Sequence, residues 1–291
     1  MSEPYVVTLS CPDRVGIVHA VTGLLVEHQA NITEAAQFND ASTGLFFMRV
    51  RFDVAAPFPE QAKTGLRDAF AALAKTYAMR WDLHNANDRM PTVIMVSKLG
   101  HCLNELLFRY RSQLLPLDIR AIVSNHRDFY QLAASYDIPF HHIPVTTATK
   151  ERAEDRLREV LAHENVELVV LARYMQVLSE RLCNDLSGRA INIRHSFLPS
   201  FKGARPYQQA FDRGVKLIGA TAHYVTGDLD EGPIIEQDIA RADHAMSPAQ
   251  LTAIGPRHRV RGAGARRGLA CRTSGAAQWA QDCRLPLTGL H

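Results

Sequence analysis

The part of the sequence that most constrains the fold is a run in which short apolar segments alternate with helical patterns. It begins with a largely apolar segment at 92–97, typical of a strand buried on both faces, and a helical pattern at 103–110 follows. Further segments predict strands at 119–123, 139–143, 168–171 and 190–193, and helices near Phe129 and at 153–163 and 179–186. This alternation predicts an α/β domain with a mostly parallel sheet that helices cover on both faces.

The first 84 residues follow a different order of elements. An alternating segment at 5–10 precedes a turn at 11–16 and a helix with apolar residues at 18, 21, 24 and 25. Strands are then predicted from Asn31 and at 44–52, a helix at 58–75 and a last strand at 79–83. The order βαββαβ predicts a small domain over residues 1–84. Residues 85–90, which are mostly polar, suit a linker to a second domain at 91–255.

Composition excludes several classes of protein. With 46% hydrophobic and 22% charged residues, the chain is typical of a soluble globular protein. Residues 256–291 hold seven arginines and one aspartate, a net charge of 7 − 1 = +6, whereas the whole chain has +3. The rest of the chain therefore has a net charge of 3 − 6 = −3 and carries no nucleic-acid signature. The five cysteines lack the spacing of a zinc site or a disulfide framework, and no secretory signal or membrane-spanning run is present. We therefore expect a cytoplasmic protein that binds neither nucleic acid nor membrane.

Two polar stretches hold the groups that an enzyme would need. Residues 190–199, A-I-N-I-R-H-S-F-L-P, read as a short strand that ends in N-x-x-H, and residues 223–233, H-Y-V-T-G-D-L-D-E-G-P, as a strand followed by an acidic loop. Together they offer an amide (Asn192), an imidazole (His195) and a carboxylate (Asp230). An amide can hold a carbonyl oxygen that gains charge, and the other two can move or orient a proton. Each residue alone also has an ordinary explanation, as a core histidine or a turn aspartate.

The two stretches, N-I-R-H-S-F-L-P-S-F and H-Y-V-T-G-D-L-D-E-G-P-I-I, resemble the folate-dependent formyltransferases over about residues 91–255. The resemblance implies a Rossmann-like domain of the formyltransferase type with Asn192, His195 and Asp230 as its catalytic centre. Asn192 and His195 would share the formyl oxygen and the proton, and Asp230 would take a proton from water or hold His195 charged. His223 would pair with Asp230 and support it without contacting the substrate.

The same resemblance implies where the folate binds. One wall would be the segment Tyr174, Met175, Gln176, Val177 and Leu178, which follows a predicted strand, and the other the loop Thr226, Gly227 and Asp228. The alternative for the first segment is ordinary packing at a helix start, since aromatic residues and methionine usually fill cores. No bound cofactor or metal is expected, because the folate is the substrate and no nucleotide-binding motif is present.

The amino-terminal segments L-S-C-P-D-R-V-G-I-V and N-I-T-E resemble the ACT domain, a regulatory fold that binds amino acids at domain interfaces. The resemblance implies an amino-acid effector bordered by Asp13, Arg14, Val15, Gly16, Asn31 and Ile32, and a homo-oligomer. The alternative is that these residues form only a helix cap and a strand edge.

An ACT domain before the formyltransferase fold narrows the resemblance to the formyltetrahydrofolate deformylase family. It implies hydrolysis of 10-formyltetrahydrofolate to tetrahydrofolate and formate, which would supply formate for purine synthesis and balance the one-carbon folate pools. The turn at 97–102 is bulky and lacks the Gly-Ser-Asn pattern of formyltransferases that bind a phosphorylated amine, so water is the expected acceptor. Two alternatives stay open, a formyltransferase to an amine acceptor and a catalytically impaired amino-acid sensor.

The sequence after Gly255 departs from the pattern before it. Residues 256–291 are rich in arginine and glycine and show neither helical nor strand periodicity, so we expect a poorly ordered basic tail. One base fewer in a permitted coding sequence turns P-R-H-R-V-R-G-A-G-A into R-D-I-E-C-V-A-L-A-R, which starts an amphipathic helix. We therefore hypothesise a frameshift near Gly255. Resequencing the codons for residues 254–261 tests it, and the hypothesis is wrong if no one-base shift restores that helix.

Overall fold

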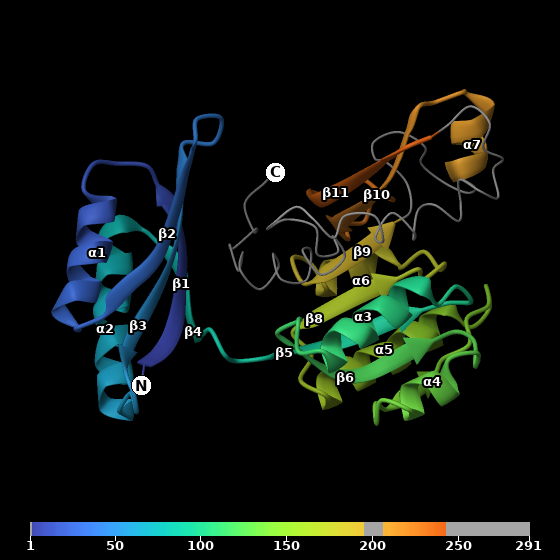
Figure 1. Cartoon of the computed structure of the whole chain (residues 1–291), viewed down its shortest axis with the longest axis horizontal. Coiled ribbons are helices and arrows are strands. Elements are labelled where there is room, and N and C mark those ends of the chain that lie inside the picture. Colours follow the sequence, from blue (N-terminus) through green and yellow to red (C-terminus); the bar gives the residue numbers. More distant parts are fainter. Residues whose placement is uncertain (1, 195–205, 243–291) are drawn as a thin grey trace. The chain divides into compact units, whose positions relative to one another are not determined.

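The chain folds into two compact units that divide after Asp88 (Figure 1). The computed structural model describes residues 2–194 and 206–242, with only the backbone at 206, 207, 210 and 238–240. Strand β4 ends the first unit at Asn85 and β5 begins the second at Met90.

The first unit is a four-stranded antiparallel sheet with both helices on one face (Figure 1). Its strands lie in the order β2-β3-β1-β4, which confirms the predicted ACT-like arrangement. The elements are β1 (Ser2–Pro12), α1 (Ile17–Glu27), β2 (Asn31–Asp40), β3 (Leu45–Ala55), α2 (Glu60–Tyr77) and β4 (Arg80–Asn85).

Alternation along β3 explains why this sheet has a helix-covered face. Every second side chain from Phe46 to Val54 is buried, because successive residues of a strand point to opposite faces. Leu66, Phe70 and Ala74 of α2 are buried at a spacing of four, which places them on one stripe of that helix. The stripe and the strand face form a single hydrophobic core.

The second unit is a seven-stranded sheet in the order β11-β10-β9-β8-β5-β6-β7. Strands β5 to β9 run parallel, and β10 and β11 are antiparallel at one edge, as the predicted mostly parallel sheet allows. The elements are β5 (Met90–Val96), α3 (His101–Arg111), β6 (Leu117–Ser124), α4 (Tyr130–Ala134), β7 (Phe140–His142), α5 (Lys150–His163), β8 (Leu168–Ala172), α6 (Glu180–Asp185), β9 (Ala190–Arg194), α7 (Pro206–Asp212), β10 (Leu217–Tyr224) and β11 (Ile234–Arg241).

Both faces of this sheet are covered, as the apolar strand segments predict. Val93 and Met95 of β5 pack in one core with residues of α5 and α6. Ile94 points to the opposite face and is also fully buried. A parallel sheet needs such cover on both sides, because its strands carry apolar residues on both.

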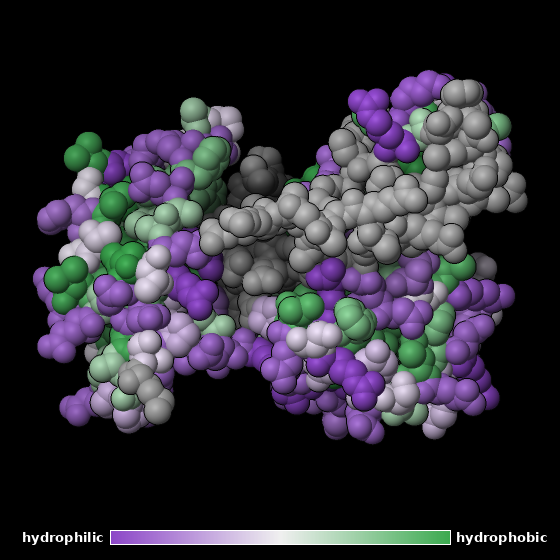
Figure 2. Space-filling model, in the orientation of Figure 1, coloured by the Kyte–Doolittle hydropathy of each residue, from purple (hydrophilic) through white to green (hydrophobic). Residues whose placement is uncertain are grey.

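The surface agrees with a protein whose apolar side chains lie mostly inside. Figure 2 shows hydrophilic residues spread over the visible face of each unit, with smaller hydrophobic groups between them. Among the described residues, no helix has the length and hydropathy needed to cross a membrane.

Candidate active site

Three polar side chains meet where β9 and β10 pair. Asn192 lies directly opposite His223 in the register of the two strands, and Arg194 lies two residues further along β9, on the same face as Asn192. The loop after β10 brings Asp230 to this group, with its side chain fully buried. The structure therefore places the predicted Asn192, His223 and Asp230 together. The predicted His195 lies outside the described residues.

Arg194 is the closest partner of Asp230 and was missed by the sequence reasoning. Its Nη1 donates to Oδ1 of Asp230 at 2.6 Å, and its own side chain is only 16% exposed. The other carboxylate oxygen, Oδ2, is buried and has no hydrogen-bond partner among the described residues. A signal was available in the sequence, because strand alternation puts position 194 on the face of Asn192.

His223 supports Asn192 more directly than it supports Asp230. Its Nδ1 lies 2.8 Å from the carbonyl oxygen of Tyr224, which can only accept, so Nδ1 carries the proton. Nε2 then accepts from the amide Nδ2 of Asn192 at 3.3 Å. The same Nε2 is 3.8 Å from Oδ1 of Asp230, beyond hydrogen-bond distance. His223 thus lies beside Asp230 without a hydrogen bond to it, and its hydrogen bond goes to Asn192 instead.

Burial keeps His223 neutral. Its pKa is lowered mainly because the imidazole is desolvated, while the Tyr224 carbonyl and the nearby Asp230 act in the opposite direction and Arg194 adds to the lowering. A neutral ring with its proton on Nδ1 holds the Asn192 amide by one N–H. Within residues 2–194 and 206–242, no other hydrogen bond of that amide nitrogen is seen, so its second N–H can donate to an oxygen of a bound molecule.

The backbone of the acidic loop fixes where Asp230 lies. Asp230 has φ 61, a left-handed conformation that aspartate adopts more readily than most residues. Two residues later, Gly232 packs so closely on β10 that an added Cβ would lie 1.8 Å from the carbonyl oxygen of Tyr224. Tyr224 N donates to the Pro233 carbonyl at 2.9 Å and closes the loop.

An open pocket in the second unit includes most of the predicted folate wall. Its empty volume, with its mouth, is about 320 Å³. Tyr174, Gln176, Val177 and Leu178 line it together with residues of β5, β6 and α5. Met175 is not among the lining residues and is 60% exposed. Burial, with a contribution from the Glu154 carboxylate, raises the pKa of Tyr174 to about 12, so its hydroxyl stays protonated.

The first predicted wall of the folate site, residues 174–178, is anchored by hydrogen bonds at both ends. Ser97 Oγ accepts from the amide of Met175 at 2.9 Å and donates to Oδ1 of Asn125 at 2.7 Å. At the other end, the buried Glu154 of α5 accepts from the amide of Ser179 at 2.8 Å and from its hydroxyl. Between these anchors, residues 176–178 face the pocket.

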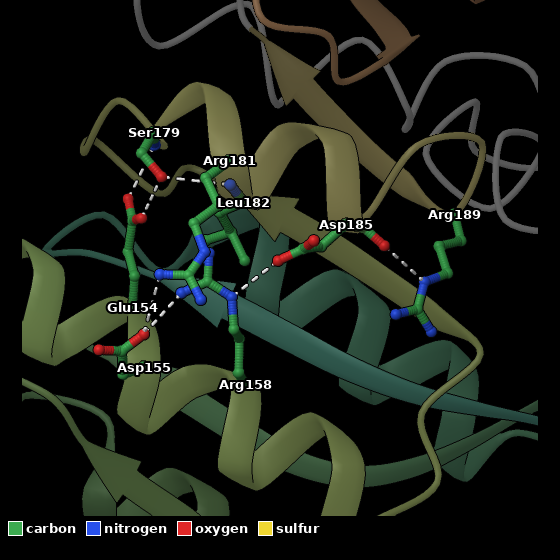
Figure 3. A network of polar contacts seen from close by, with 8 residues as sticks. All are labelled: Glu154, Asp155, Arg158, Ser179, Arg181, Leu182, Asp185 and Arg189. Atoms are coloured by element: carbon green, nitrogen blue, oxygen red, sulfur yellow. Dashed lines mark hydrogen bonds and ion pairs between the residues drawn. The ribbon is translucent and has the colours of Figure 1, made fainter.

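A network of polar contacts around Ser179 secures the second anchor (Figure 3). Ser179 caps α6 by accepting from the amide of Leu182 at 3.2 Å. Arg158 of α5 contacts Asp155 at 2.8 Å and Asp185 of α6 at 2.7 Å. The network therefore joins the two helices whose ends position the wall segment.

The predicted second wall, Thr226 to Asp228, lies near the same helix end. An added Cβ on Gly227 would be 3.6 Å from Cγ of Glu180, the first residue of α6. Val225, just before the loop, packs on the hydrophobic core that Tyr174 and Leu178 also contact. The loop is stiffened by Thr226, whose hydroxyl donates to the Asp228 carbonyl at 3.1 Å.

In the first unit, the predicted effector residues fall into two groups. Asp13 lies where β2 ends, because its amide donates to Gly44 at 2.9 Å and its carboxylate accepts from Asn39. Arg14 stacks on the Tyr77 ring, with 4.0 Å from Cζ to the ring centroid, and donates to the Thr76 carbonyl.

The two residues after Arg14 show how the turn enters helix α1. Val15 is fully exposed. Gly16 caps α1 with φ 97, a conformation that glycine adopts without strain. This turn is one of the two groups of predicted effector residues.

The second group, Asn31 and Ile32, begins β2 at the opposite end. Asn31 pairs with Asp53, whereas Asp40 pairs with Leu45, so the length of β2 separates Asn31 from the Asp13 turn. From Asn31 to Asn39, the residue of β2 that contacts Asp13, the distance along the strand is roughly 25 Å at about 3.3 Å per residue. One copy of the chain therefore does not bring the two groups together.

The comparisons with known proteins cover both units. The Formyl transferase family model matches residues 90–258 and the ACT domain model residues 5–57. The chain is 51% identical to the formyltetrahydrofolate deformylase of Corynebacterium sp. (strain P-1), over 88% of this chain and 89% of that protein. It is 38% identical to that of Escherichia coli (strain K12), over 84% and 85%.

Comparison with solved structures gives matches to the same kinds of protein. The crystal structure of formyltetrahydrofolate deformylase from Burkholderia mallei matches with TM-score 0.82 and 50% identity, covering 87% of this chain and 89% of that one. The phosphoribosylglycinamide formyltransferase of Coxiella burnetii matches with TM-score 0.53 and 32% identity, over 58% of this chain and 81% of that one. With an ACT domain followed by a formyl transferase domain, and with these matches over most of its length, the chain belongs to the formyltetrahydrofolate deformylase family.

Proposed function

We propose that this chain hydrolyses 10-formyltetrahydrofolate to tetrahydrofolate and formate. The observation that carries the proposal is the meeting of Asn192 and Asp230 at the β9–β10 pair, in a domain that matches deformylases over most of its length. The reaction needs a group to hold the formyl oxygen and a group to take a proton from water. Asn192 and Asp230 supply these two groups.

The first step is attack of water on the formyl carbon. The water oxygen forms a bond to that carbon, the C=O π electrons move to the formyl oxygen, and Asp230 takes the proton. The second N–H of Asn192 donates to the oxygen that becomes negative, as donors of an oxyanion hole do. His223 fixes the amide for this role through the 3.3 Å contact.

The second step breaks the bond between carbon and the folate nitrogen. The electron pair of that bond goes to nitrogen, which must gain a proton to leave as an amine. We assign this proton transfer to His195 on the basis of the family resemblance of the N-x-x-H stretch. The products are tetrahydrofolate and formate, and one proton is released overall.

Formate release distinguishes this proposal from its two alternatives. Purified protein with 10-formyltetrahydrofolate in buffer should release formate and tetrahydrofolate in equal amounts, and an added amine should not raise the rate. Consumption that depends on an amine and yields a formylated amine would favour a formyltransferase. No consumption, together with a thermal shift from an amino acid, would favour a sensor without activity.

The folate wall gives a prediction about substrate affinity. Glu154→Ala is expected to raise KM for 10-formyltetrahydrofolate about tenfold with little change in kcat, because the segment at 176–178 loses the anchor at Ser179. The matched control is Glu159→Ala, an exposed residue of the same helix whose 2.6 Å contact is with Arg156 and involves no residue of that anchor. Steady-state kinetics check both variants, and an equal change in KM in the two would contradict the assignment.

The ACT-like unit implies a small-molecule effector, and we propose that it is an amino acid. The two groups of predicted contact residues lie roughly 25 Å apart along β2 in one copy. A ligand that touches both groups would therefore lie between two copies of the chain, which supports the proposed homo-oligomer.

Titration of the common amino acids in a thermal-shift assay is expected to reveal one that raises the unfolding temperature. Asn31→Ala should abolish that shift, because Asn31 is a predicted effector contact. The variant should keep the stability of the protein without effector, because Asn31 is exposed at the start of β2 and contributes little to the core. If no amino acid changes the unfolding temperature of the wild-type protein, the sensing role is wrong.

A further inference from the structure

The two oxygens of the Asp230 carboxylate have different surroundings. Oδ1 accepts from Arg194 at 2.6 Å and lies 3.8 Å from the ring of His223. Oδ2 is equally buried but has no hydrogen-bond partner among the described residues. A buried carboxylate oxygen without a partner is costly unless something else satisfies it, such as a water or a substrate atom.

We infer that Arg194 is a positioning residue that occupies Oδ1 of Asp230 and thereby makes Oδ2 the oxygen that meets the attacking water. The inference rests on the proposed hydrolysis. In the step concerned, the water O–H bond breaks as its oxygen bonds to the formyl carbon, and the proton goes to Oδ2. Arg194 itself gains and loses no atom.

The chemistry of arginine suits this role. The guanidinium of arginine offers N–H donors in a fixed fork and no acceptor, so we assign Arg194 an orienting contact and no proton transfer. It can hold a carboxylate in one orientation by a short charge-assisted hydrogen bond. The left-handed backbone at Asp230 and the close packing at Gly232 fix the other end of the pair.

The position of Arg194 on β9 links it to the second catalytic group. Because residues 192 and 194 share one face of the strand, the guanidinium and the Asn192 amide are held by the same short segment. An orienting contact built on a strand is more exact than one built on a loop. The strand thus sets the angle between the oxyanion donor and the proton acceptor.

Two substitutions separate this role from a purely structural ion pair. Arg194→Lys keeps the charge, and Arg194→Gln keeps a donor but loses the charge. We expect kcat of the Lys variant to stay within about tenfold of wild type and kcat of the Gln variant to fall about 10²-fold, with KM in both within about twofold. The matched control is Arg109→Gln, which breaks the 2.7 Å contact of a similarly buried arginine with Glu105 within α3, apart from both catalytic stretches and from the folate wall.

A double variant completes the test. If Arg194 acts through Asp230, Arg194→Gln should lower kcat little further when Asp230 is already Asn, because the two act as a unit. Independent, multiplying losses would overturn the inference. So would an Arg194→Gln variant with wild-type kcat, or one whose loss in kcat equals that of Arg109→Gln. If Arg194→Gln does not fold, a Lys variant with kcat as low as that of Asp230→Asn would overturn it. A wild-type protein that releases no formate would overturn the proposed function and the inference together.

Discussion

Asp230→Asn is expected to lower kcat for formate release by about 10²–10⁴-fold, because an amide cannot take a proton from water. Folate binding should stay measurable, since the wall residues Gln176, Val177 and Leu178 line a separate part of the site. Formate release and equilibrium binding of tetrahydrofolate, measured on the same preparation, check both statements.

The matched control for this variant is Asp228→Asn, two residues earlier in the same loop. Asp228 is exposed, and its described contacts are made by its backbone carbonyl, so kcat should change little, and any effect of its place in the predicted second folate wall should fall on KM. Near-native turnover by Asp230→Asn would refute the assignment. His195→Ala should be comparably damaging, and the two effects should not multiply if the residues act as a unit.

Gly232→Ala is expected to damage both stability and activity. Its Cβ would lie 1.8 Å from the Tyr224 carbonyl oxygen and 2.8 Å from the carbonyl carbon, and backbone atoms of a paired strand cannot move aside cheaply. We expect a loss of about 2–4 kcal/mol in the free energy of unfolding and at least a tenfold fall in kcat, as the loop that holds Asp230 shifts.

The same methyl group added at Gly65 provides the control. Gly65 lies within α2, where an added Cβ meets nothing within 4 Å, so Gly65→Ala should keep full activity and stabilise the helix by about 0.5–1 kcal/mol. Denaturant unfolding and formate release, compared across the two variants, measure the difference. A Gly232→Ala protein as stable and active as Gly65→Ala would show that the loop geometry is wrong.

The sequence predicted the elements well because hydrophobic periodicity reports burial directly. The run at 92–97 is buried on both faces, as its largely apolar residues predict, and the 3.6-residue spacing of α5 correctly marks its buried stripe. Ends of elements differed by a few residues. Helix α5, for example, starts at Lys150 rather than at 153, because Lys150, Glu151 and Arg152 carry no apolar signal.

The site was predicted in part. Asn192 and Asp230 follow from motifs, but the contact between Arg194 and Asp230 depends on the path of the loop between β10 and β11, which no periodicity encodes. Glu154 was missed although a signal existed, since a carboxylate lies on the buried stripe of α5 beside Ala153 and Leu157. His195 and the proposed frameshifted tail lie outside the described residues, and both assignments stay predictions.

The effector residues show a different limit of sequence reasoning. Asp13 and Asn31 were expected to border one ligand because of the resemblance of the first unit to ACT domains. Their distance is set by the register of β2 on β3, where Asn31 pairs with Asp53 and Asp40 with Leu45. Register depends on pairing across the sheet and cannot be obtained from the strand sequences one at a time.

Hydrolysis in ¹⁸O-labelled water tests the central claim most directly. If water activated at Asp230 attacks the formyl carbon, the formate formed in a single turnover should carry one labelled oxygen, and its other oxygen should come from the formyl group. Mass spectrometry of the released formate measures this. Formate without label, or a formyl group recovered on an added amine instead of as formate, would contradict the account.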